Sequence, residues 1–163
     1  MAAKTLKDEV LAVEPEPNQK VSSILLALLA VAVLIASYVA FSFLPDRTLV
    51  INNKRVNVLL ADTSAERAKG LSDRDRMNSD QGMLFVFDTP SQYCFWMKDM
   101  KFPIDMVWLN KDKKIITIRA NATPDSYPDT FCPDEDAQYV LEISAGQAAN
   151  LHIKEGDQAQ FKL

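Results

Sequence analysis

The sequence predicts a mainly β (α+β) domain with two short helices, a compact β-barrel-like or curled-sheet fold, behind an N-terminal transmembrane helix. Three observations predict this class. Short apolar, β-branched runs alternate with turn signals beyond residue 45. Only two short segments in that region have the character of helices. Residues 21–44 form one long run without charge or proline.

Composition limits the possible functions. The chain has 163 residues, which suits one modest domain and an appendage. It is 48% hydrophobic and 25% charged, which is ordinary globular usage. The formal net charge of −4 argues against nucleic acid as a partner, because nucleic-acid binders present a basic surface.

The run at residues 21–44 predicts a signal anchor over residues 20–44 with the lipid bilayer as its partner. A helix of this length rises roughly 36 Å, and a bilayer core is about 30 Å thick. A buried core helix of that length would normally carry a polar face. A cleaved signal peptide would have a shorter apolar region, of about 7–15 residues, and Ala40-Phe41-Ser42 is a weak cleavage site.

The flanks of this run suggest an orientation. Residues 1–19 contain the sequence EPEP and few large apolar residues, which predicts a short disordered cytoplasmic tail. Basic residues near the two ends of the run are nearly balanced, with Lys20 on one side and Arg47 on the other. A short tail before the helix and a folded domain after it favour a single-pass protein with residues 45–163 outside the cytoplasm.

The first elements of this domain have clear local signals. Residues 47–62 predict a hairpin that turns at Asn52-Asn53, because asparagine tolerates the positive φ of a tight hairpin. Thr63 and Glu66 form a capping-box pattern that begins a short helix, and Gly70 is expected to end it.

Later segments predict the remaining strands and the second helix. Residues 82–88 predict a buried strand, and Gly156-Asp157 predicts a tight turn in which Asp157 accepts backbone hydrogen bonds and which leads into a closing strand. The other expected elements are adjoining core strands at 94–98 and 104–110, a hairpin at 109–118, a strand at 139–144 and a helix at 145–153.

Several motifs together resemble the DUF192 family, also called UPF0127. They are RAKGLSDR, GMLFVF, FWMK, PID, VLE and a final GD, and the resemblance covers about residues 55–163. The family pattern has Lys-Asn-Thr where this chain has Lys98-Asp99-Met100. The resemblance implies an uncharacterised domain whose relatives often follow a signal peptide or a membrane anchor. It implies no biochemical activity.

Charged residues within these motifs are candidates for a site. Trp96 and Lys98 are expected on one face of a strand, and Asp105 on a mostly apolar face. Such charges fit either buried structural ion pairs or a ligand groove with aromatic walls. We expect Lys98 to pair with Asp105 or Glu142. The candidates for the groove are Arg67, Arg74, Trp96, Lys98, Asp105 and Glu142.

The two cysteines, Cys94 and Cys132, predict a disulfide if the domain is exported; the alternative is two free thiols. His152 is the only histidine, which disfavours a catalytic thiol. Without a cluster of histidine, cysteine and carboxylate at ligand spacing we expect no metal, and no motif predicts a cofactor.

Three function classes follow. The first is a cell-envelope ligand-binding or accessory module. The second is an envelope hydrolase with Asp105 or Glu142 as general base, which a perturbed carboxylate beside Lys98 would favour. The third is a structural interaction domain without a ligand site, which a filled interior would favour.

Overall fold

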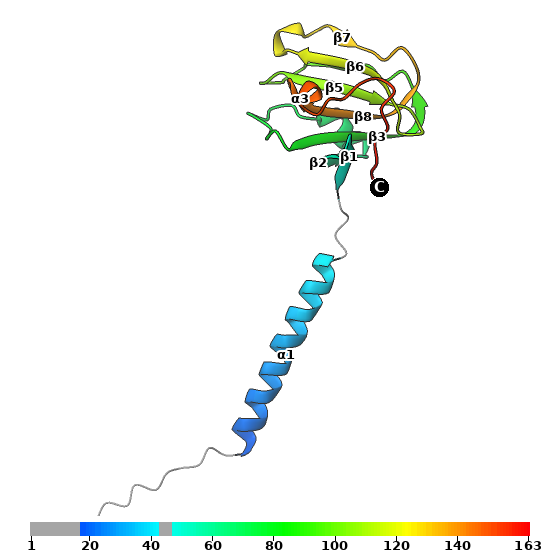
Figure 1. Cartoon of the computed structure of the whole chain (residues 1–163). Coiled ribbons are helices and arrows are strands. Elements are labelled where there is room, and N and C mark those ends of the chain that lie inside the picture. The colour runs from blue at the N-terminus through cyan, green and yellow to red at the C-terminus, as the bar shows by residue number, and fades with distance from the viewer. Residues whose placement is uncertain (1–16, 43–46) are drawn as a thin grey trace, which may run out of the picture. The chain divides into compact units, whose positions relative to one another are not determined.

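The computed structural model describes residues 17–42 and 47–163, with side chains in the first segment described over 23–36. The chain divides into two compact units, Met1–Leu44 and Pro45–Leu163. Helix α1 (Pro17–Ser42) belongs to the first unit, and all other elements belong to the second (Figure 1). The disordered tail predicted for residues 1–19 lies outside the described residues as far as residue 16.

The sequence predicts a transmembrane helix over residues 20–44. None of the helices in the described part of the chain is long and apolar enough to cross a membrane.

The second unit is built on a six-stranded sheet with the order β1-β2-β3-β8-β5-β6, accompanied by a two-stranded sheet of β4 and β7. Within the large sheet β2 and β3 are parallel, and every other neighbouring pair is antiparallel. The strands are β1 (Thr48–Ile51), β2 (Lys54–Ala61), β3 (Gln81–Ser91), β4 (Phe95–Trp96), β5 (Ile104–Leu109), β6 (Ile115–Ala122), β7 (Thr130–Phe131) and β8 (Ala137–Ser144).

Three short helices accompany the sheets, where the sequence predicted two. They are α2 (Ser64–Lys69), the 3-10 helix η1 (Pro124–Ser126) and α3 (Gln147–Asn150). The helix that was missed, η1, is a single turn with Pro124 at its start, so it is too short for a periodic apolar pattern.

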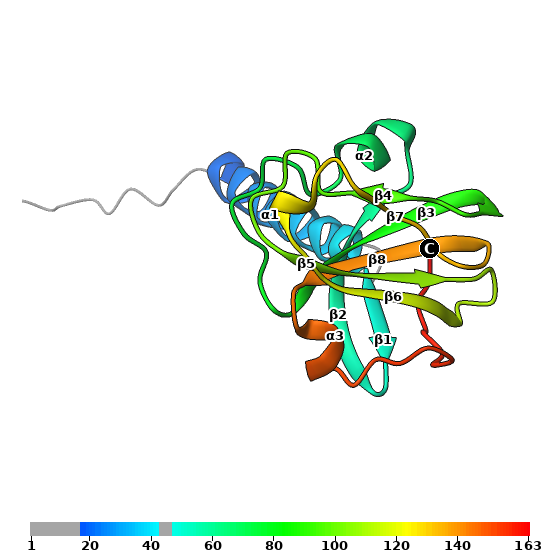
Figure 2. The same ribbon diagram turned by 90° about the horizontal axis from the view of Figure 1, so that it is seen from above.

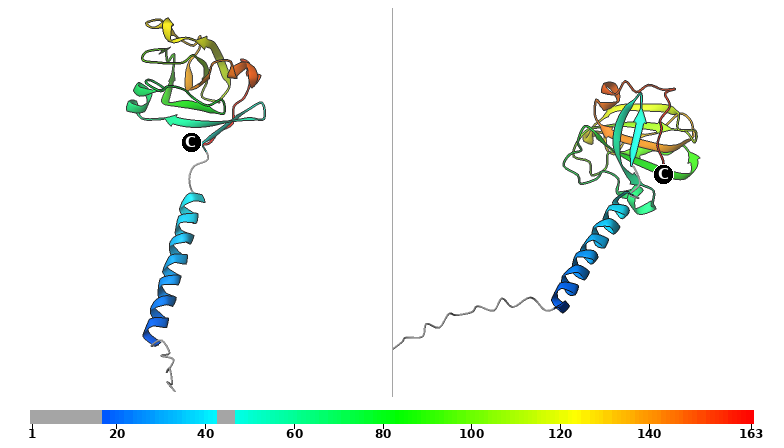
Figure 3. Two further views of the ribbon diagram at one scale, coloured as in Figure 1. Left: turned by 90° about the vertical axis from the view of Figure 1, so that its left-hand side faces the viewer. Right: turned by 60° about the horizontal axis from the view of Figure 1, so that its bottom comes forward.

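The sheet is not closed into a barrel, so the barrel-like form of the prediction is wrong. Its edge strands are β1 and β6, and the last segment of the chain makes only isolated bridges, from Gln160 to Val50 and from Gln158 to Lys114 (Figure 3). The predicted turn at Gly156-Asp157 is present, with Gly156 at φ 93°. The segment that follows is too irregular to continue the ladder, and the predicted closing strand is absent from the described residues.

The first hairpin and the helix after it have the local structure that the sequence predicts. Asn52 and Asn53 adopt φ of 51° and 60° at the turn between β1 and β2. The Thr63 hydroxyl accepts a hydrogen bond from the Glu66 N–H at 3.2 Å, and the Thr63 N–H donates to the Glu66 carboxylate at 3.1 Å. Helix α2 therefore starts at its cap and forms the crossover between parallel strands β2 and β3.

The segments at 94–98 and 104–110 do not adjoin as core strands. Strand β4 pairs with β7 in the small sheet, whereas β5 lies between β6 and β8 in the large one. Between them Asp99 adopts φ 57°, so the chain turns out of an extended path before Pro103. The predicted disulfide between Cys94 and Cys132 is confirmed, with Cα atoms 4.2 Å apart, and joins the ends of β4 and β7.

Two apolar clusters cover opposite faces of the large sheet. The α2 face carries Met83, Phe85, Met106, Trp108 and Val140, together with Phe95 and Phe131 from the small sheet. The α3 face carries Leu84, Val107, Leu141, Ile143 and Ala148. Figure 2 shows α2 and α3 on opposite sides of the sheet. Because successive side chains in a strand alternate, neighbouring residues of β5 and β8 belong to different faces.

Candidate functional site

Asp105 lies on the α3 face, where both of its carboxylate oxygens accept hydrogen bonds. Its side chain is 0% exposed. One carboxylate oxygen accepts a hydrogen bond from the N–H of Asn121 at 2.8 Å, and the other accepts from the N–H of Ala148 at 2.9 Å. The carboxylate thus joins β5 to β6 and to α3. It is a structural residue and does not line the groove in which the sequence analysis expected it.

Glu142 lies on the α2 face and has the opposite character. Its cross-strand neighbours are Met83 on β3 and Met106 on β5. It is 4% exposed, and none of the hydrogen bonds of the described residues involves its carboxyl group. Burial alone raises the pKa of Glu142 to about 8. The carboxyl oxygens still reach solvent, because none of the fully buried side-chain oxygens and nitrogens of the described residues lacks a partner.

A small cavity gives the Glu142 carboxyl group its access to solvent. This Glu142 cavity has a volume of about 50 Å³. Apolar side chains form part of its wall, including Phe85, Phe95 and Met100, and Ser72 and Lys98 lie on its polar side. The cavity therefore brings one buried carboxyl group and one exposed lysine to the same small space.

An aromatic groove of about 330 Å³ borders this cavity. Phe87 and Tyr93 stack with ring centroids 3.5 Å apart, and Phe85 meets Phe95 edge to face at 4.8 Å. Trp96 is 56% exposed. The cavity and the groove share lining residues, so they adjoin; the shared residues are Arg67, Ala68, Phe85, Phe95 and Trp96.

The second tryptophan is placed differently. Trp108 is fully buried in the cluster on the α2 face, and its indole N–H donates a hydrogen bond to the carbonyl of Tyr93 at 2.9 Å. This bond fixes the segment between β3 and β4, which carries one wall of the aromatic groove.

Arg67 lines both parts of the site, but its guanidinium group already has partners. It donates to the carbonyl of Val86 at 2.8 Å and also to the carbonyl of Asp62. The guanidinium carbon lies 5.3 Å from the centre of the Phe87 ring. Arg67 therefore attaches α2 to β3 and shapes the wall of the groove.

Lys98 is exposed and lies in the turn after β4. The backbone carbonyl of Lys98 accepts a hydrogen bond from the Ser72 hydroxyl at 3.1 Å. None of the ion pairs among the described residues involves Lys98, so the predicted pair with Asp105 or Glu142 is not observed. For Asp105 the reason is its place on the opposite face of the sheet. Lys98 and Glu142 nevertheless border the same cavity.

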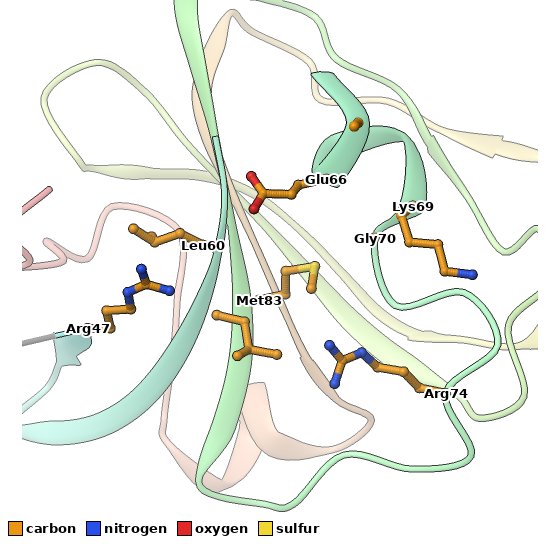
Figure 4. Close-up of a pocket in the computed structure, with 9 residues that line it drawn as sticks. Arg47, Leu60, Glu66, Lys69, Gly70, Arg74 and Met83 are labelled. Carbon is orange, nitrogen blue, oxygen red and sulfur yellow. The ribbon is translucent and has the colours of Figure 1, made fainter. Parts of the chain in front are cut away.

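Arg74 lies in a different pocket, called here the arginine pocket, with a volume of about 430 Å³. Figure 4 shows Arg74 and Arg47 approaching it from different segments, with Leu60, Met83 and Glu66 around them. Lys69 and Gly70 border both this pocket and the Glu142 cavity. Four of the six predicted residues thus share one site, and two do not; the four are Arg67, Trp96, Lys98 and Glu142.

The aromatic wall and the Ser72 hydroxyl were not among the residues predicted for the site. Phe85 and Phe87 are two residues apart on β3 and so share a face, a pattern that could have assigned them to the wall. Tyr93 and Ser72 lie outside helices and strands, where no sequence periodicity predicts which way a side chain points. The disulfide removes both cysteines as nucleophiles. The described residues contain no group of three or more histidine, cysteine or acidic side chains that could hold a metal.

The matches to known proteins agree with this architecture. A model of the DUF192 family, described as an uncharacterized ACR, matches residues 47–161. The chain belongs to the DUF192 family.

Two solved structures resemble this DUF192 domain. A protein of unknown function from Novosphingobium aromaticivorans DSM 12444 is 32% identical, with a TM-score of 0.67 over 70% of this chain and 84% of that one. A putative transcription regulator from Sinorhizobium meliloti 1021 is 33% identical, with a TM-score of 0.65 over 70% of this chain and 90% of that one. The search of curated proteins gave no match.

Proposed function

We propose that the DUF192 domain of this chain is a ligand-binding module, and that the aromatic groove together with the Glu142 cavity is its binding site. One observation carries the proposal. Glu142 is a largely buried acid whose carboxyl group makes no hydrogen bond with the described residues, and it borders a cavity that adjoins an aromatic groove.

The carboxyl group of Glu142 is available to a ligand. Met83, Met106 and the aromatic side chains around Glu142 offer no strong partner. A ligand that enters the cavity would replace water at this carboxyl group with a hydrogen bond of its own. Such an exchange contributes about 0.5–1.5 kcal/mol, and more where one partner is charged.

The groove provides the rest of a binding site. Pockets for small molecules are mostly apolar, with a few polar groups that fix the orientation of the ligand. Here Phe87, Tyr93, Phe95 and Trp96 give the apolar walls, while Lys98 and Glu142 give the polar end. The presence of this open space argues against a purely structural domain with a filled interior.

A hydrolase is the second candidate, because one observation favours it. A carboxyl group whose pKa is raised to about 8 can act as a general acid or base near neutral pH. That role falls to Glu142. Asp105 is not available for it, since both of its oxygens accept backbone hydrogen bonds and it is fully buried.

For localisation we propose a signal anchor over residues 20–44, with the domain outside the cytoplasm. The uncharged run supports the anchor, and large apolar side chains within it, such as Leu26, Leu29 and Leu34, are exposed. The Cys94–Cys132 disulfide supports an oxidising compartment. The full chain is then expected in the membrane fraction, and protease added outside the membrane should digest the domain; a full-length soluble chain would contradict this.

The binding site is tested with the full chain labelled at its methionine methyl groups. Met100 borders the Glu142 cavity, so its NMR signal should shift when a small molecule from a fragment library occupies the site. Trp96→Ala should weaken every such interaction. Arg74→Ala is the matched control, because Arg74 lies in the arginine pocket. Fragments that respond to Arg74→Ala and ignore Trp96→Ala would contradict the proposed site.

A further inference from the structure

We infer that the ligand of this site is an apolar or aromatic carboxylic acid, bound as its carboxylate between the ammonium group of Lys98 and the carboxyl group of Glu142. The inference rests on the proposed ligand-binding function and adds the chemical class of the ligand. It follows from the charges, the size and the walls of the site.

The charges that border the Glu142 cavity come first. Its ionisable residues are Arg67 and Lys69 from α2, Lys98 from the turn after β4, and Glu142 from β8. Lys69 is paired with Asp73, and Arg67 donates to two backbone carbonyls. Lys98 is therefore the cation at this cavity whose side chain has neither an ion pair nor a hydrogen bond among the described residues.

Glu142 does not balance that cation near neutral pH. Because burial raises its pKa to about 8, its carboxyl group is mainly protonated at pH 7. A protonated carboxyl group can donate one hydrogen bond, and a carboxylate can accept it. A bound carboxylate would thus meet a donor on one side and an ammonium group on the other, whereas a bound cation would meet Lys98 and Arg67 as like charges.

The size of the cavity selects the head group. Its volume of about 50 Å³ exceeds the share of one water molecule in the liquid, about 30 Å³. A carboxylate is a small planar group that this space can hold. Hydrogen bonds between an acid and a carboxylate are charge-assisted, and they are stronger in a buried setting.

The aromatic groove selects the rest of the ligand. The groove of about 330 Å³ is bordered by Phe87, Tyr93, Phe95 and Trp96, and it adjoins the cavity. An aromatic ring or a branched aliphatic group would bury apolar surface against these rings and could pack edge to face with them. The head group and the body of such a ligand then match the two parts of the site in order.

The experiment compares three probes that share one apolar body: phenylacetate, phenylacetamide and phenethylamine. Each is titrated into the methionine-labelled full chain in detergent micelles, and the dissociation constant is read from the Met100 methyl signal. Near pH 6.5 we expect phenylacetate to bind at least about tenfold more tightly than the other two, as for one charge-assisted hydrogen bond.

Two variants and the pH dependence of binding separate the role of Glu142 from that of Lys98. Raising the pH above about 8 should weaken phenylacetate in the unmodified protein, because a second carboxylate then faces the ligand. Glu142→Gln keeps a neutral donor, so it should retain binding of phenylacetate and lose this pH dependence. Lys98→Met should weaken phenylacetate roughly tenfold and leave phenylacetamide unchanged.

The outcomes are distinct. Preferred binding of phenethylamine, with an affinity that rises toward pH 9, would overturn the carboxylic-acid inference and leave the ligand-binding function standing. Preference for phenylacetate that survives both Lys98→Met and high pH would also overturn the inference, because the anion would then be recognised elsewhere. Absence of any Met100 response to all three probes would count against both proposals.

Discussion

Asp105 and Glu142 are two buried acids on adjacent strands of one sheet, and they differ in almost everything except burial. Asp105 faces the α3 side and accepts two backbone hydrogen bonds. Glu142 faces the α2 side, and its carboxyl group makes no hydrogen bond with the described residues. The difference teaches that burial alone does not define the role of an acid. What distinguishes the two is whether the fold itself satisfies the carboxyl group.

The surroundings of the two acids repeat this contrast. Beside Asp105, α3 contributes Ala148 to the apolar cluster of its face. Glu142 instead borders the cavity that adjoins the aromatic groove. The fold thus encloses the carboxylate of Asp105 and leaves open space beside that of Glu142. Four measurements would break or sharpen this comparison.

The largest expected effect comes from the disulfide that joins β4 and β7, the small sheet on the α2 face. Replacing Cys94 and Cys132 together by serine should lower the free energy of unfolding by about 4 kcal/mol, the chain-entropy value for a sequence separation of 38 residues. Urea unfolding of the variant and of the oxidised protein measures the change, and the reduced unmodified protein is the control. Equal urea midpoints for all three would show that the disulfide does not contribute to the stability of the domain.

The next effect tests Glu142 through pH. Its pKa is about 8 in the folded state against an ordinary value of 4.5, so between these values the folded state binds more protons than the unfolded state. The contribution of Glu142 to stability must therefore fall as pH rises through this window. From pH 5 to pH 7.5 the loss should be about 3 kcal/mol.

Glu142→Gln removes that titration. The variant should lack this part of the pH dependence and should be more stable than the unmodified protein near pH 7.5, because an amide carries no charge to desolvate. Urea unfolding at several pH values provides the measurement. A variant that follows the same pH curve as the unmodified protein would place the titrating group elsewhere.

Asp105→Asn is the matched substitution on the other face, and it should have the opposite sign. The amide keeps one acceptor and turns an NH₂ group toward the second backbone N–H, of Asn121 or of Ala148. Leaving that buried N–H unsatisfied should lower stability by about 2 kcal/mol. If the two amide variants changed stability in the same direction near pH 7.5, the contrast between the acids would fail.

The smallest effect belongs to an acid outside both faces. Asp157 accepts hydrogen bonds from the Lys154 N–H at 2.8 Å and from the Asn52 side chain at 2.9 Å, and these bonds hold its pKa below the ordinary value. Asp157→Ala should lower stability by about 1 kcal/mol, a typical net value for such bonds. Thermal unfolding gives the shift, and an unchanged midpoint would mean that the turn forms without them.

Local features of this fold could be predicted from the sequence because their causes are local. The turn at Asn52-Asn53, the cap at Thr63 and the turn at Gly156-Asp157 each depend on a few adjacent residues. Strand alternation also assigned Asp105 and Met106 to opposite faces of β5. The order of the strands could not be predicted, because pairing between β3 and β8 or between β4 and β7 joins residues far apart in the chain.

The site was predicted in part for the same reason. Strand alternation predicted Trp96 and Lys98 on one face; Lys98 lies in the turn after β4, and both residues border the Glu142 cavity. The family motifs mark Arg67 and Glu142. The sequence could not report that Asp105 faces away from Lys98, since that depends on which side of the sheet β4 covers. Arg74 was assigned to the groove and lines the arginine pocket instead, four positions after Gly70, which borders both the arginine pocket and the Glu142 cavity.

The placement of the two tryptophans has a practical consequence for spectroscopy. Trp96 stands at the mouth of the aromatic groove, open to water, whereas Trp108 is sealed in the interior with its N–H bonded to Tyr93. A soluble collisional quencher such as acrylamide will therefore extinguish the emission of one indole and spare the other. The fluorescence of Trp96 can therefore report on binding in the groove, and that of Trp108 can serve as an internal reference, without an attached dye.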